Sequence, residues 1–160
     1  MSLADLSSIL WRERELLELL LFKLEEEQLI LATSRPRWLA HATREVEVVL
    51  DQIRRTEVLR ATEVQGVGDE LGCGDNPSLT ELAERSPEPW SDLLREHRRT
   101  FVRLTTEVAE LAEANQGLLT SGQRAVRDAM LVLTENVESY DRRGETVATG
   151  PLPRLLDAAM

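Results

Sequence analysis

The chain has 160 residues, a formal net charge of −10, and only 4% aromatic residues. This length fits one domain with a real core and is too short for two independent cores. Binding to nucleic acid requires concentrated positive charge, so the acidic balance argues against nucleic acid as a partner. Leu, Val, Ala, Glu and Arg dominate the sequence, a composition typical of long helices, and we therefore predict an all-α fold.

The compartment is inferred from cysteine content and hydropathy. Cys73 is the single cysteine, so no intramolecular disulfide can form and a reducing compartment is the natural context. The most apolar run, residues 16–22, contains Glu18 and is far too short to span a membrane. No basic region precedes an apolar one at the N-terminus, so we expect no secretory signal and no membrane insertion. These features predict a cytoplasmic protein.

The first predicted helix covers about residues 3–33. Ser2 and Asp5 have the spacing of a helix N-cap, and leucines then recur at alternating steps of three and four residues. Glu13 and Glu27 are the exceptions on this apolar ladder.

Pro36 interrupts the pattern, and a second helix is predicted over residues 36–65. Proline is tolerated in the first turn of a helix and not in its interior, so residues 33–36 should form a tight turn. The same apolar spacing then resumes in the second helix. We expect an antiparallel helical hairpin whose arms are each about 45 Å long.

Residues 66–89 are rich in glycine and proline and are predicted to be a linker. Within the linker, Ser78 and Glu81 have the spacing of a capping box, which predicts a short helix over residues 78–85. Whether this linker folds back along the next helix is left open by the sequence.

A very long third helix is predicted over residues 90–140. Apolar residues recur there without interruption, no proline intervenes, and a helix of this length would reach roughly 75 Å. Asn115 lies on the apolar face and is interpreted as a polar residue that sets the helix register. The fold is thus expected to be an elongated three-helix bundle or coiled coil. It would form a single domain over residues 1–145, followed by a flexible tail over residues 146–160.

The far end of the third helix would extend past the hairpin by about 30 Å unless the linker covers it. An apolar stripe without a partner is costly in water, so we expect another protein, a second copy or the tail to cover it. Two interpretations stay open, namely ordinary core or dimer packing, and a groove that receives a client helix. The predicted partner-binding residues are Leu119, Val126, Met130, Leu133, Val137 and Tyr140.

No catalytic or cofactor site is predicted. His41 and His97 are the only histidines, and neither has the Glu-x-x-His arrangement of di-iron bundles. No complete phosphate-binding glycine motif is present. We therefore expect no enzyme, no metal and no cofactor.

The order of these elements resembles the FlgN family of flagellar export chaperones. The similarity covers most of residues 3–144 and rests on Asn115 with Leu118 and Leu119, and on the closing Tyr140-Asp141-Arg142-Arg143-Gly144. The resemblance implies binding to the C-terminal helices of hook-filament junction proteins, which prevents their premature assembly and helps their delivery to the export gate. It also implies that no cofactor is used.

Two rival hypotheses have different consequences. A homodimeric coiled-coil adaptor or scaffold with no export role would pair its third helices and form a stable dimer. A metal-dependent bundle enzyme would retain bound iron or manganese after purification.

Overall fold

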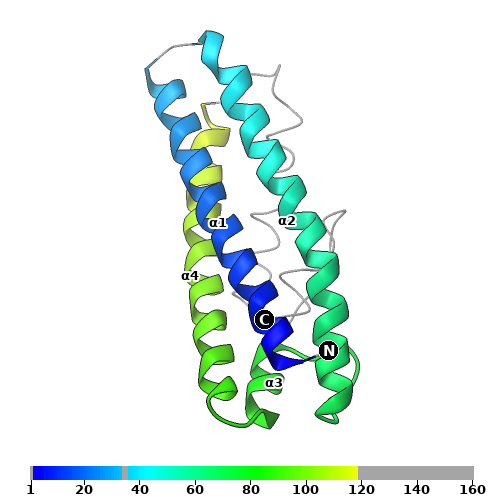
Figure 1. Cartoon of the computed structure of the whole chain (residues 1–160). Coiled ribbons are helices and arrows are strands. Elements are labelled where there is room, and N and C mark those ends of the chain that lie inside the picture. Colours follow the sequence, from blue (N-terminus) through cyan, green and yellow to red (C-terminus); the bar gives the residue numbers. More distant parts are fainter. Residues whose placement is uncertain (1, 34–35, 119–160) are drawn as a thin grey trace.

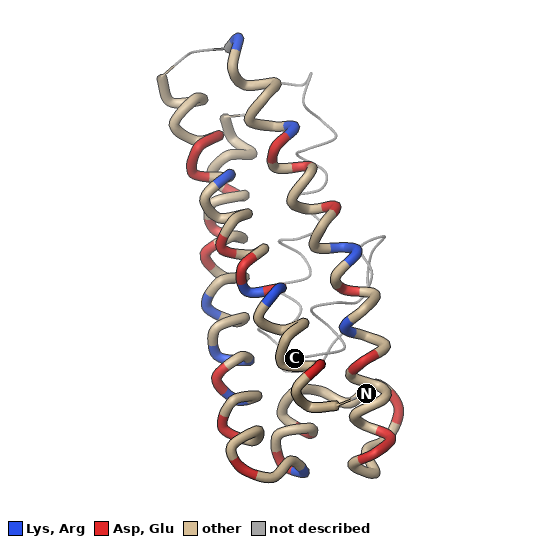
Figure 2. The backbone as a smooth tube through the Cα atoms, viewed as in Figure 1, with Lys and Arg blue, Asp and Glu red and all other residues tan. Residues whose placement is uncertain are grey.

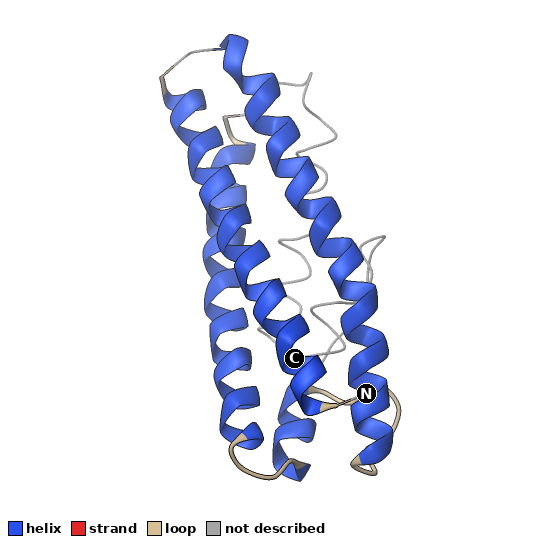
Figure 3. Cartoon of the chain, viewed as in Figure 1, coloured by secondary structure: helices blue, strands red, loops and turns tan. Residues whose placement is uncertain are grey.

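The computed structural model describes residues 2–33 and 36–118 of the chain. It contains four helices: α1 (Leu3–Ala32), α2 (Pro36–Glu70), α3 (Leu79–Arg85) and α4 (Trp90–Gln116) (Figure 1). Every regular element in these two ranges is a helix (Figure 3). The predicted all-α fold class is therefore confirmed.

Helix α1 begins where its capping residues require. The backbone N–H of Asp5 donates to the Ser2 hydroxyl over 3.1 Å, and that hydroxyl donates to the Asp5 carboxylate over 2.7 Å. At the other end, Thr33 donates its backbone N–H to the carbonyl of Leu29. The chain then returns as α2, which runs antiparallel beside α1 (Figure 1).

Helix α2 continues to Glu70, and the predicted end near residue 65 is wrong. Glycine costs about 1 kcal/mol relative to alanine inside a helix, but Val64 and Val67 are fully buried in the core and their packing outweighs that cost. The helix instead ends in a Schellman motif. Its left-handed residue is Gly72 at φ +72°, and the N–H of Cys73 donates to the carbonyl of Gly68 over 2.8 Å.

Helix α3 forms inside the linker as its capping box predicts. The N–H of Glu81 donates to the Ser78 hydroxyl over 3.1 Å, and the N–H of Ser78 donates to the Glu81 carboxylate over 2.8 Å. Leu79 and Leu82 are fully buried. The helix packs against α4 at the end of the bundle where α4 begins, so this short helix covers the base of the core (Figure 1).

Helix α4 runs from Trp90 to Gln116, and a turn at Gly117 and Leu118 follows it. The remaining part of the predicted long helix, residues 119–140, lies outside the described residues. The predicted tail, residues 146–160, and the domain boundary at residue 145 lie outside them as well.

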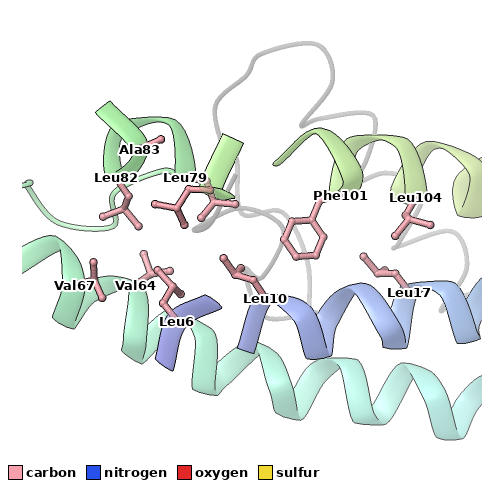
Figure 4. Close-up of a cluster of buried hydrophobic side chains, with 11 residues drawn as sticks. Leu6, Leu10, Leu17, Val64, Val67, Leu79, Leu82, Ala83, Phe101 and Leu104 are labelled. Carbon is pink, nitrogen blue, oxygen red and sulfur yellow. The ribbon is translucent and has the colours of Figure 1, made fainter. Parts of the chain in front are cut away.

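The core consists of two apolar clusters stacked along the bundle, and α1 contributes to both. The lower cluster joins α1 to the end of α2, to α3 and to the first half of α4 (Figure 4). The upper cluster joins α1 to the first half of α2 and the second half of α4. The backbones of α2 and α4 both pack closely on α1 and approach each other much less (Figure 1). Helix α1 is thus the shared central element of the described bundle.

Candidate functional site

The residues predicted to bind a partner all lie outside the part of the chain that the structure describes. They are Leu119, Val126, Met130, Leu133, Val137 and Tyr140. The last described residue, Leu118, is half-exposed. Helix α4 ends at the same end of the bundle as the end of α1 and the start of α2 (Figure 1).

Within residues 2–33 and 36–118, no group of three or more His, Cys, Asp or Glu side chains is placed to hold a metal ion. Cys73 is partly buried and forms no disulfide. In the same ranges, no helix is both long enough and apolar enough to cross a membrane.

His97 is fully buried between α1 and α4. Arg14 Nη1 lies 3.4 Å from its Nδ1, and Ser7 Oγ lies 3.5 Å from its Nε2. A guanidinium only donates, so Nδ1 accepts and the proton on Nε2 is donated to Ser7. Burial and the nearby Arg14 charge lower the pKa of His97 to about 4. His97 is therefore a neutral core residue, and the ring of Trp11 packs edge-on against it.

A buried ion pair joins α1 to α2. Arg60 is fully buried and donates from Nη1 to Glu13 Oε2 over 2.7 Å, while its Nη2 lies 3.6 Å from Glu57 Oε1. Burial raises the pKa of Glu13 to about 7, although the Arg60 charge opposes that rise. Glu13 thus occupies a core position of the leucine ladder because a single arginine of α2 meets it there.

A second buried polar group joins α1 to both α2 and α4. Asn115 donates from Nδ2 to the carbonyl of Leu24 over 3.0 Å and to Glu27 Oε1 over 3.1 Å. Thr43 of α2 donates to the other oxygen of the Glu27 carboxylate over 3.3 Å. Burial raises the pKa of Glu27. These bonds form in one alignment of the three helices, which agrees with the predicted register role of Asn115.

Large apolar side chains remain exposed on the outer face of α1. Trp11, Leu19, Phe22 and Leu29 are 39–67% exposed, and acidic residues lie between them along the helix. At the hairpin end, a shallow pocket of about 340 Å³ is lined by Leu29, Ile30, Thr33 and Trp38. By their spacing these four side chains share one face of α1, and an apolar helix face of this kind is a candidate surface for binding another protein. The described residues therefore form a helical scaffold suited to binding other proteins.

Comparison with known proteins identifies one family. The model of the FlgN protein family matches residues 1–148. No curated protein and no solved structure matches the chain.

Proposed function

This chain belongs to the FlgN family of flagellar export chaperones, and we propose that its clients are the proteins that join the flagellar hook to the filament. The family match carries this proposal, because it spans residues 1–148 and therefore includes the whole predicted apolar stripe. The family is one of chaperones and not of enzymes. We further propose that the protein acts in the cytoplasm.

The proposed client is an amphipathic C-terminal helix of a junction protein. Such a helix binds through apolar side chains at steps of three and four residues, the spacing of the stripe from Leu119 to Tyr140. Met130 lies near the middle of this stripe, and its unbranched, polarizable side chain adapts to more than one client surface. Covering these side chains would keep the client from assembling early and would hold it for delivery to the export gate.

Isothermal titration of the full chain with the C-terminal peptide of a junction protein tests this proposal. We expect saturable binding with a fixed stoichiometry. Replacing an apolar contact by a charge at Val126→Asp, Met130→Asp or Leu133→Asp should weaken binding by about tenfold, because the charge must be buried against the client.

Val48→Asp is the matched control, because Val48 is 50% exposed on the outer face of α2. This variant should bind as the unmodified chain does. If all three stripe variants also bind normally, the stripe is not the client site. If no junction-protein peptide binds at all, the proposed client class is wrong.

A further inference from the structure

A shallow groove lies between α1 and the second half of α4. It has a cavity volume of about 340 Å³. Leu21 and Glu25 line it from α1, and Glu107, Glu110, Leu111 and Ala114 line it from α4. The groove belongs to the face where the two helices meet.

The floor of this groove is apolar and supported from below. Leu21 and Leu111 are partly buried and pack against the upper core cluster, while Ala114 is exposed. Leu111 and Ala114 share one face of α4 by their spacing of three, and together they form a short apolar row along the groove.

The rim of the groove is acidic. Glu25 and Glu110 are exposed on opposite sides of it, and neither forms an ion pair with another described residue. Glu107 is paired with Arg103, whose Nη1 lies 3.0 Å from Glu107 Oε1. Acidic residues lie along both α1 and α4 (Figure 2). A ligand that places positive charge beside Glu25 and Glu110 would complement both carboxylates.

We propose that this groove binds an amphipathic helix of a partner protein in which lysines or arginines flank an apolar row. The apolar row would cover Leu21, Leu111 and Ala114, while the cationic groups reach Glu25 and Glu110 and their aliphatic stems cover the groove walls. The inference goes beyond the proposed client stripe, because it concerns a different surface formed by α1 and α4.

Electrostatic repulsion disfavours a second copy of the chain in this groove and favours a helix that carries positive charge. Two copies of net charge −10 repel each other, and pairing groove against groove would bring together the Glu25 and Glu110 carboxylates of both copies. The groove is shallow and open, whereas a pocket for a small molecule normally encloses its ligand.

The probe for this proposal is a labelled amphipathic peptide of about 18 residues, with leucines along one face and lysines on both flanks. Binding to the full chain is measured by fluorescence anisotropy, and amide NMR shifts locate the contact. We expect shifts centred on Leu21, Glu25, Leu111 and Ala114, and an affinity that falls as salt is raised. Shifts centred on another surface would overturn the proposal.

Paired charge reversals separate the groove from a general effect of net charge. The variant Glu25→Lys with Glu110→Lys should bind the peptide about tenfold more weakly, because two attractions become repulsions. Glu47→Lys with Glu84→Lys changes the net charge equally at exposed positions on α2 and α3, and it should bind more nearly as the unmodified chain does.

A peptide with glutamates in place of the lysines should bind the Glu25→Lys, Glu110→Lys variant better than it binds the unmodified chain. This recovery requires a folded groove, so it excludes unfolding as the cause of the first loss. Equal weakening by both double variants, or no recovery with the charge-swapped peptide, would overturn the proposal.

Discussion

Arg60 is the largest fully buried side chain in the described part of the molecule. Its guanidinium lies against Glu13 of α1 and Glu57 of its own helix. The ion pair with Glu13 therefore joins the two arms of the hairpin. Taking an arginine out of water is costly, and the Glu13 carboxylate offsets part of that cost. Loss of Arg60 would leave the Glu13 carboxylate buried without its cation.

We expect Arg60→Ala to lower the free energy of unfolding at pH 8 by about 3–5 kcal/mol, because Glu13 then loses its buried cation. Urea unfolding followed by circular dichroism measures this change. Arg55→Ala is the control, since Arg55 is exposed and pairs with Asp51 on the surface, and it should change stability little. Equal stability of Arg60→Ala and the unmodified chain would refute this account of the pair.

Glu13 and His97 give opposite dependences of stability on pH. The pKa of Glu13 is raised from 4.5 to about 7, so its contribution is complete below pH 4.5 and is lost as pH rises through about 7. The pKa of His97 is lowered from 6.5 to about 4, so its contribution is complete above pH 6.5 and is lost as pH falls through about 4. The two effects oppose each other between pH 4.5 and 6.5.

Glu13→Gln should therefore make stability rise more steeply from pH 5 to pH 7 than it does in the unmodified chain. The difference between the two free-energy changes should be about 2 kcal/mol, since the variant loses the Glu13 term and keeps the His97 term. Urea titrations at both pH values measure it. Parallel pH profiles for the two proteins would contradict the raised pKa of Glu13.

The sequence predicted only some of the features of the buried polar residues. The ladder marked Glu13 and Glu27 as exceptions, and the polar Asn115 on the apolar face forms a buried hydrogen bond with Glu27, while its register role stays a prediction. The partners were missed because Glu13 meets Arg60 from 47 residues away, which depends on how the hairpin arms align. A usable signal was present, since Arg60 follows Ile53 and precedes Val64 at core spacing in α2.

At the scale of the elements, two glycines in or beside helices have opposite roles. A Cβ on Gly68 would lie 2.6 Å from Pro77 Cγ, so only glycine lets the linker approach α2 this closely. Gly117 has φ −67° and ψ −17°, and among the described residues a Cβ there would meet nothing closer than the Ala114 carbonyl oxygen at 3.8 Å. The first glycine is required by packing, and the second is not.

Gly68→Ala should destabilise the protein by about 1–3 kcal/mol, because the Pro77 ring and the linker backbone must move. Gly117→Ala should stabilise it by about 0.5–1 kcal/mol, because alanine restricts the unfolded chain and fits the observed backbone. Thermal unfolding of both variants measures the two effects. The same direction of change in both would contradict the contrast between these sites.

The helix ends show why element boundaries were harder to predict than the elements themselves. Capping residues correctly marked the starts of α1 and α3, since a cap is a local interaction between residues three apart. The end of α2 was misplaced because several glycines follow residue 65, and each of them could end a helix. The burial of Val67 in the core extends the helix past the earlier glycines, so that Gly72 becomes the C-terminal glycine. Burial depends on the tertiary structure and cannot be judged from the local sequence.

At the scale of the whole molecule, α1 organises the described bundle, and its outer side carries exposed apolar side chains. Its inner face supplies both core clusters and both buried polar links. The groove with α4 was not predicted, because it depends on how closely α1 and α4 cross, and Leu21 lies outside the leucine ladder. The predicted client stripe lies in residues 119–140, and binding measurements test it directly.

Affinity purification of the tagged full chain from its native cells tests the central claim most directly. We predict that hook-filament junction proteins co-purify in a fixed ratio with the unmodified chain and with Val48→Asp, and that Met130→Asp loses them. Co-purification of only a second copy of the chain, or of proteins unrelated to the hook-filament junction, would contradict the account.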